Sequence, residues 1–104
     1  MSCGLSSEQL VERSETILRP LFAGVRERRE LENGVEYRFS GDDAWKVRLY
    51  EFVDTERNCC SFIRIELAFE SGFGPIWLRL SGDDNAQAFI AETFDSLVNL
   101  VVRT

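Results

Sequence analysis

A six-residue segment that occurs twice most constrains how this chain folds. Residues 38–43 have the sequence R-F-S-G-D-D and residues 79–84 have R-L-S-G-D-D. Each copy follows a stretch of alternating apolar and polar residues and precedes an apolar pattern of helical period. Ser, Gly and Asp are common at turns and helix starts, so the match is consistent either with a duplicated unit or with two similar junctions.

The periodicity around each copy predicts a ββα unit. We expect an exposed or edge strand within 21–31 and further strands over 35–39, 63–69 and 76–80. Helices are expected from about residue 43 to residue 58 and from about residue 84 onward. The chain therefore divides into a leader with a first helix (1–20), a first ββα unit (21–58) and a second ββα unit (59–104). The predicted fold is α+β, with a four-stranded antiparallel sheet and helices on one face.

Short local signals set the expected ends of these elements. Ser6 and Ser7 are suited to cap the first helix, and Pro20 is expected to end it. The Asn33–Gly34 pair indicates a two-residue hairpin turn with positive φ angles. Residues 71–75 are expected to form the second hairpin loop.

The composition restricts the classes of partner. The chain has 104 residues, enough for a single domain with one core, and carries a formal net charge of −6. An acidic surface repels phosphate backbones and anionic lipids, so neither nucleic acid nor membrane is expected as a partner. The N-terminus lacks a signal-peptide pattern and the chain lacks an apolar run of spanning length, so we expect a cytoplasmic protein. In that reducing compartment three cysteines are expected to be thiols.

Two adjacent cysteines, Cys59 and Cys60, are the most distinctive chemical feature. They fall where the second predicted helix ends, and the chain contains no histidine. Neighbouring side chains diverge along a strand, whereas a helix-to-strand junction can bring two sulfurs together. Such a pair suits thiophilic ions, namely Zn, Hg, As, Cu or Cd, with Cys3 as a candidate third ligand and Glu51 or Glu56 as the other strong options.

The same cysteines have a purely structural interpretation. Cysteine is among the residue types most often buried, so two packed thiols would also explain the pattern. Arg57 favours a thiolate, while Glu56 and the negative end of the helix oppose it, so an activated nucleophile is not indicated. We expect the two sulfurs to lie close together without a disulfide between them, and at least one to be reachable from solvent.

Strand alternation places a second candidate site on the sheet face turned away from the predicted helices. Besides Glu36 and Glu66, this face is expected to carry two aromatic residues and three arginines, namely Phe62, Trp77, Arg38, Arg64 and Arg79. Such a set predicts a face covered by the first helix or by a second copy in a homodimer. The arginines are alternatively suited to hold a small anion.

The segments around the cysteines and the second hairpin resemble a known sequence family. Residues 56–67, E-R-N-C-C-S-F-I-R-I-E-L, and residues 74–82, G-P-I-W-L-R-L-S-G, resemble small bacterial proteins with E-R-x-C-C-x-F and G-P-x-W-L segments. Their function is uncharacterised. Many have one cysteine in a short leader, as Cys3 is here. Similar C-C segments occur in appendages to metal-responsive regulators, and the resemblance therefore raises the metal interpretation without implying an activity.

Enzyme classes find little support in the sequence. A hydrolase would need a positioned base, and no carboxylate pair is singled out by its spacing. A thioredoxin-type motif would place Cys-x-x-Cys ahead of a helix, not Cys-Cys behind one. We therefore expect a small cytoplasmic protein that binds a soft metal or metalloid through Cys59, Cys60 and Cys3. The alternative is a non-catalytic interaction module that dimerises through its arginine- and tryptophan-bearing sheet face.

Overall fold

The computed structural model describes residues 12 and 14–98 and contains one antiparallel four-stranded sheet. The strand order is β1-β2-β4-β3, so β1 and β3 form the two edges. The strands are β1 (Glu27–Leu31), β2 (Gly34–Phe39), β3 (Arg64–Phe69) and β4 (Ile76–Ser81). All three strand pairings are antiparallel, as the sequence predicts.

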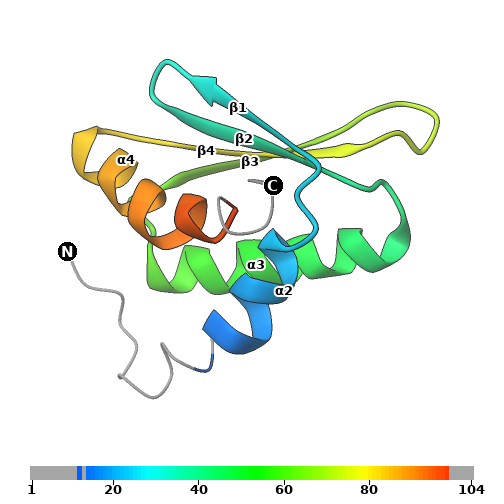
Figure 1. Cartoon of the computed structure of the whole chain (residues 1–104), viewed down its shortest axis with the longest axis horizontal. Helices are drawn as coiled ribbons and strands as arrows, with labels where there is room; N and C mark the ends of the chain where they lie inside the picture. The colour runs from blue at the N-terminus through cyan, green and yellow to red at the C-terminus, as the bar shows by residue number, and fades with distance from the viewer. Residues whose placement is uncertain (1–11, 13, 99–104) are drawn as a thin grey trace.

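The helices lie together on one face of this sheet (Figure 1). The leading helix consists of a π-helical turn η1 (Ser14–Leu18) followed by α2 (Arg19–Phe22). The long helix α3 (Asp43–Cys59) follows β2, and α4 (Asp84–Ile90) with the π-helical turn η2 (Ala91–Asp95) follows β4. The α+β architecture of a leading helix and two ββα units is confirmed.

The register between the two central strands has the symmetry expected of a repeat. Positions 41 residues apart in the sequence are equivalent in the two hexapeptide copies, and Tyr37 of β2 pairs with Leu78 of β4. Around this central pair, Arg38 pairs with Trp77 and Glu36 pairs with Arg79. Arg38 is equivalent to Arg79 and Glu36 to Trp77, so exchanging the two repeat copies converts one of these pairs into the other. The strands of the two units therefore meet across a local pseudo-twofold axis at Tyr37 and Leu78.

The two junctions also cap their helices in the same way. The Asp42 carboxylate accepts a hydrogen bond from the backbone N–H of Trp45 at the start of α3. The Asp83 carboxylate accepts the corresponding bond from the N–H of Ala86 at the start of α4. Each bond satisfies one of the amide groups that a helix start leaves without an intrahelical partner. The second acid of the S-G-D-D segment is thus not the cap but the first helical residue.

The core fills the space between the sheet and the helices. The inward positions of the central strands are fully or almost fully buried, and α3 contributes Leu49 and Phe52. The leading helix places Phe22 at the centre, with its ring edge-on to Tyr37 and Phe52 and stacked on Phe94. The fully buried inward residues of the central strands are Tyr37, Phe39, Leu78 and Leu80.

The start of the first unit differs from the sequence-based expectation. The helix does not end at Pro20 but runs to Phe22, so residues 21–26 are not part of a strand. Pro20 lies in the first turn of α2, where a missing backbone N–H costs no intrahelical hydrogen bond. The strand begins only at Glu27. The predicted capping by Ser6 and Ser7 lies outside the described residues.

The first hairpin turn is also built differently from the prediction. The turn residues between paired Leu31 and Gly34 are Glu32 and Asn33, and Gly34 is already the first residue of β2. Neither Asn33 nor Gly34 is among the described residues with positive φ. Gly34 is needed instead for close packing, because a Cβ atom there would collide with the backbone carbonyl of Leu80. Left-handed φ angles occur in the second loop, at Gly72 and Phe73.

Candidate metal site and the outer sheet face

The cysteine pair lies where α3 ends. Cys59 is the last residue of the helix, and Cys60 caps it with φ −129° and ψ 61°. The Cys60 N–H donates to the carbonyl of Glu56 at 2.6 Å, and its carbonyl accepts from the N–H of Ile63 at 3.2 Å. These two hydrogen bonds tie Cys60 to the preceding helix and to the following loop. Because Cys60 leaves the helical conformation, its side chain no longer diverges from that of Cys59 as it would inside a helix.

The two sulfur atoms are brought into contact. The Sγ atoms of Cys59 and Cys60 lie 3.1 Å apart. Neither of these two cysteines is free, so the free thiols expected from the sequence are not observed among the described residues. A disulfide bond is about 2.05 Å long, so these two sulfurs are not bonded to each other. The prediction that the sulfurs converge at the helix-to-strand junction is confirmed.

The surroundings of the sulfurs are less open than expected. Cys60 is fully buried and Cys59 is 9% exposed, and both belong to the hydrophobic core. The expected solvent-facing sulfur is therefore not observed. This burial also fits the structural interpretation of the pair as packed core residues. Any ligand would reach the sulfurs only through local opening of the helix end.

Of the two carboxylates considered as further ligands, one lies on the same side of α3 as Cys59. Glu56 precedes Cys59 by three residues, a spacing that places these two on one helical face, and its carbonyl accepts the N–H of Cys60 at the helix end. Its side chain is fully buried, whereas Glu51 is exposed. Among residues 12 and 14–98, however, no three His, Cys, Asp or Glu side chains are grouped to hold a metal ion. Cys3, the predicted third ligand, lies outside the described residues.

The second candidate site, the outer face of the sheet, is crossed by ion pairs. The pairing of the strands places Arg38 beside Trp77, and Arg64 near Arg79 across the β3–β4 ladder, on the face opposite Tyr37 and Leu78. These four residues share a face, as predicted. The same face also carries Glu36 and Glu66, as the alternation predicts, and Arg29 and Glu27 of β1, which were not predicted.

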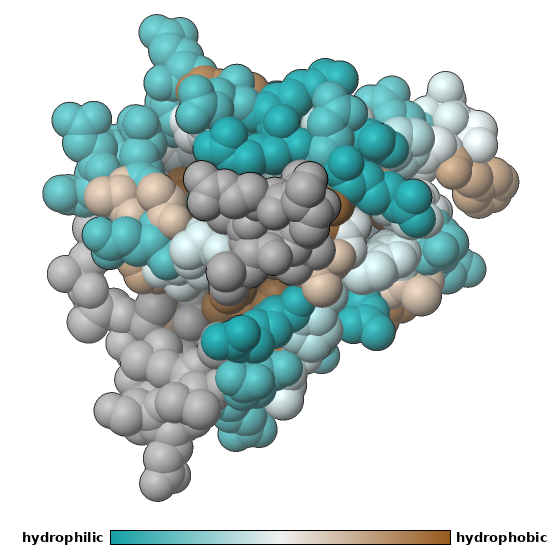
Figure 2. Space-filling model, viewed as in Figure 1, coloured by the Kyte–Doolittle hydropathy of each residue, from teal (hydrophilic) through white to brown (hydrophobic). Residues whose placement is uncertain are grey.

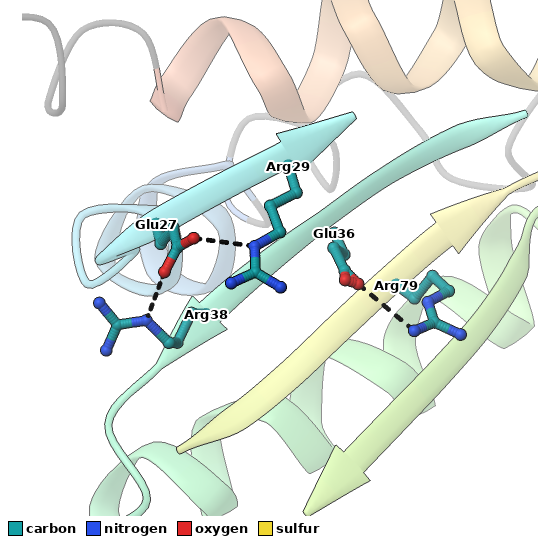
Figure 3. A network of polar contacts seen from close by, with 5 residues as sticks. All are labelled: Glu27, Arg29, Glu36, Arg38 and Arg79. Atoms are coloured by element: carbon teal, nitrogen blue, oxygen red, sulfur yellow. Dashed lines mark hydrogen bonds and ion pairs between the residues drawn. The ribbon is translucent and has the colours of Figure 1, made fainter. Parts of the chain in front are cut away.

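Each arginine of this face contacts a glutamate. Glu27 accepts hydrogen bonds from Arg29 at 2.8 Å and Arg38 at 3.1 Å (Figure 3). These two bonds lower the pKa of the Glu27 carboxyl. Arg79 contacts Glu36 at 3.3 Å and Glu66 at 3.2 Å, and the bond to Glu36 is the main cause of its raised pKa.

Arg64 pairs with Glu66 at 2.9 Å. With all four guanidinium groups engaged, the described face does not present an anion-binding cluster. In an anion-binding cluster the arginines would have no carboxylate partners, whereas each arginine of this face has one.

The two aromatic residues assigned to this face behave differently. Trp77 is half-buried and is covered by the guanidinium group of Arg29, whose central carbon lies 4.5 Å from the ring centroid. Phe62 lies before β3 and packs edge-on against Phe89 of α4, at 5.2 Å between ring centroids. Its placement on the outer face is therefore wrong, because the strand alternation does not begin until Arg64. The leading helix does not cover Trp77 either, since it packs among the helices on the opposite face.

Sequence reasoning missed a buried polar cluster that joins the two units. Asp95 of η2 accepts hydrogen bonds from Arg28 at 2.7 Å and from the hydroxyl of Tyr37 at 3.0 Å. Burial, followed by the charge of Asp95, raises the pKa of Tyr37, and the bond to Asp95 raises the pKa of Arg28. The only sequence signal was an acidic residue on the apolar face of the last helix. This cluster is an internal support of the fold, with every charge paired.

The chain is a small α+β protein with a vicinal cysteine pair at a helix C-terminus. No helix in residues 12 and 14–98 is both long and apolar enough to cross a membrane. No family model, no curated protein and no solved structure matches the chain. The resemblance of residues 56–67 and 74–82 to small bacterial proteins therefore stays a prediction.

Proposed function

We propose that this protein binds a soft metal or metalloid ion through Cys59 and Cys60. The observation that carries the proposal is the 3.1 Å contact between the two Sγ atoms at the end of α3. Thiolate sulfur is the preferred ligand type for ions such as Hg(II), As(III), Cu(I), Zn(II) and Cd(II). Two converging sulfurs supply half of a tetrahedral zinc site or most of a low-coordinate mercury or arsenic site.

The distance between the sulfurs is close to what a shared ion requires. With metal–sulfur bonds of about 2.3 Å at a tetrahedral angle, the two ligand atoms stand about 3.8 Å apart. The pair would need to widen by roughly 0.7 Å from the observed contact, a change within reach of side-chain rotation at a helix end. The widening itself needs no larger backbone movement, but entry of the ion to these buried sulfurs requires local opening of the helix end.

The electrostatics of the helix end also favour a cation. The carbonyl groups at the C-terminus of α3 carry partial negative charge, and this stabilises positive charge within the last turn. In the reduced protein, binding a divalent ion would displace the thiol protons, so affinity is expected to rise with pH until both sulfurs are deprotonated. The third ligand proposed from the sequence is Cys3, and Glu56 is the described carboxylate on the same helical face.

The alternative function, dimerisation through the outer sheet face, has weaker support. The face carries four arginines and three glutamates that already pair with one another. Covering them with a second copy would remove water from many charges, and interface centres are typically depleted of charged residues. Trp77 is also already covered in part by Arg29.

Titration with Hg(II), Zn(II) and As(III) tests the metal proposal. We expect the wild-type protein, reduced with a phosphine that does not itself present thiols, to bind strongly. Cys59→Ser and Cys60→Ser should each weaken binding by at least about 100-fold, because a hydroxyl is a poor ligand for these ions. Cys3→Ser should have a smaller effect, since the leader must be ordered before it can contribute.

Two controls keep the result interpretable. The melting temperature of each variant without metal shows whether a serine in the core has disturbed the fold, and Cys60→Ala provides an apolar substitute for the fully buried position. Ser61→Ala changes an exposed neighbour and should bind as wild type does. Equal, weak binding by the wild type and by folded serine variants would show that the cysteines are packing residues.

A further inference from the structure

We propose that the edge strand β3 pairs with β3 of a second copy, so that two four-stranded sheets join into one of eight strands. This surface differs from the outer sheet face and from the cysteine site. Within the described residues β3 pairs only with β4 and forms an edge of the sheet. The two edge strands differ in how many charged residues they carry. Four of the five residues of β1 are charged, which discourages edge pairing, while β3 has only one arginine and one glutamate.

Alternate residues of β3 direct their backbone N–H and C=O groups away from β4, toward the open edge. The N–H of Glu70 donates to the carbonyl of Pro75 at 3.2 Å, which makes these residues a hydrogen-bonded pair that extends the β3–β4 ladder. Hydrogen bonding alternates along an antiparallel strand. The N–H and C=O groups of Ile65, Leu67 and Phe69 are consequently directed to the open edge. These are the groups that a further strand would engage.

One antiparallel register matches both the backbone and the side chains. If Leu67 pairs with Leu67 of the second copy, Ile65 faces Phe69 and all three edge-directed residues form hydrogen-bonded pairs. In the same register Arg64 faces Glu70 at both ends of the paired segment. The segment R-I-E-L-A-F-E (64–70) is thus self-complementary, with opposite charges at its ends and apolar side chains at the edge-directed positions 65, 67 and 69. The charged residue between the ends, Glu66, faces Ala68 of the second copy in this register and keeps its ion pairs with Arg64 and Arg79. Opposite charges directly across a strand pair are favourable.

Exposed apolar side chains continue this edge on the helix side. Phe69 is 51% exposed, and its ring lies 6.2 Å from that of Tyr50 on α3, which is itself half-exposed. Val47, one turn earlier on α3, is 61% exposed. A second copy on the β3 edge would cover these side chains. Phe73, in the loop between β3 and β4, is 96% exposed and lies beyond the paired segment. Figure 2 shows a hydrophobic group at the right-hand end of the molecule, the end at which Figure 1 draws the β3–β4 hairpin.

Reversal of the end charges tests this register. Sedimentation equilibrium of the metal-free, reduced protein should show a reversible dimer. Arg64→Glu and Glu70→Arg should each weaken dimerisation at least about tenfold, because each places like charges opposite one another at two symmetry-related positions. The double variant R64E/E70R restores opposite charges and should return the dissociation constant to within about threefold of wild type.

The matched control is Glu30→Arg, which alters the charge of the β1 edge and should leave dimerisation unchanged. Because Arg64, Glu70 and Glu30 are exposed, all variants are expected to keep the wild-type circular dichroism spectrum. A monomeric wild-type protein, or single variants that dimerise as wild type does, would overturn the proposal. Failure of the double variant to recover would also overturn it, since recovery depends on Arg64 facing Glu70. None of these results depends on metal binding.

Discussion

At the scale of single residues, Cys60 determines whether the two sulfurs meet. Its φ and ψ angles depart from the helix immediately after Cys59, while its N–H still donates to the carbonyl of Glu56. Inside a regular helix, adjacent side chains point about 100° apart, and on a strand they point to opposite faces. The convergence therefore arises from the end of the helix rather than from the Cys-Cys sequence alone.

Tyr37 provides a residue-scale prediction about pH. Burial and the nearby Asp95 carboxylate raise its pKa in the folded protein above the ordinary value of about 10. Between these two pKa values the unfolded chain releases the phenol proton and the folded chain retains it. This difference should lower the free energy of unfolding by about 1.4 kcal/mol for each pH unit above 10, with no effect below it.

The variant Tyr37→Phe should lose that component of the alkaline slope and cost about 1 kcal/mol at neutral pH, since the bond to Asp95 is removed while Arg28 still pairs with it. Urea unfolding at a series of pH values between 8 and 11 measures both effects. Tyr50→Phe is the matched control, because Tyr50 is half-exposed and does not contact Asp95 in the cluster. An unchanged alkaline slope in Tyr37→Phe would contradict the account of the buried cluster.

At the scale of elements, the two S-G-D-D junctions cap their helices in the same way. Asp42 and Asp83 occupy equivalent positions of the repeat, and each carboxylate bonds the backbone N–H three residues later. The neighbouring acids Asp43 and Asp84 lie within the first turn of their helices and are exposed. In each junction the first Asp caps the helix by a hydrogen bond, and the second Asp only adds negative charge near the helix N-terminus.

We predict that Asp42→Ala and Asp83→Ala each lower the free energy of unfolding by about 1 kcal/mol, the usual cost of losing a capping side chain. Asp43→Ala and Asp84→Ala should cost less, because only the interaction with the helix dipole is lost. Chemical denaturation of the four variants measures the differences. A larger loss from the second acid than from the first, in either unit, would contradict the assigned caps.

Most elements were predictable because alternation and helical period are local signals. β2, β3, β4 and both helices that follow the repeat lie where the sequence places them. The segment around Pro20 was not predictable in the same way. A proline is compatible with a helix interior only near its start, and a π-helical turn preceding α2 makes Pro20 such a position. Leu21 and Phe22 then enter the core as helical residues, which the sequence alone did not distinguish from a strand.

At the scale of the whole molecule, the two units are joined by contacts between each helical region and the other unit's strands. Asp95 of the second unit contacts Arg28 and Tyr37 of the first, and Tyr50 of the first lies beside Phe69 of the second. Neither unit buries its own apolar surface alone. The sheet, the helices and the cysteine turn are therefore expected to unfold together rather than unit by unit.

The candidate site was only partly predictable at this scale. The convergence of Cys59 and Cys60 followed from their place at an expected helix end, but their depth depends on how the chain packs around that end. The outer sheet face illustrates the same limit. Alternation placed Trp77 and three arginines together, whereas their pairing with Glu27, Glu36 and Glu66 depends on the register between strands. Register is a long-range property that hydrophobic pattern specifies weakly on a charged face.

X-ray absorption at the metal edge of protein loaded with one equivalent of Zn(II) or Hg(II) tests the central claim most directly, because it identifies the atoms bonded to the ion. We predict a first shell containing at least two sulfur atoms, at about 2.3 Å for zinc. One sulfur should be lost in Cys59→Ser and one in Cys60→Ser. A first shell made only of oxygen and nitrogen, or a sulfur shell that both variants leave unchanged, would contradict the assignment of these two cysteines as metal ligands.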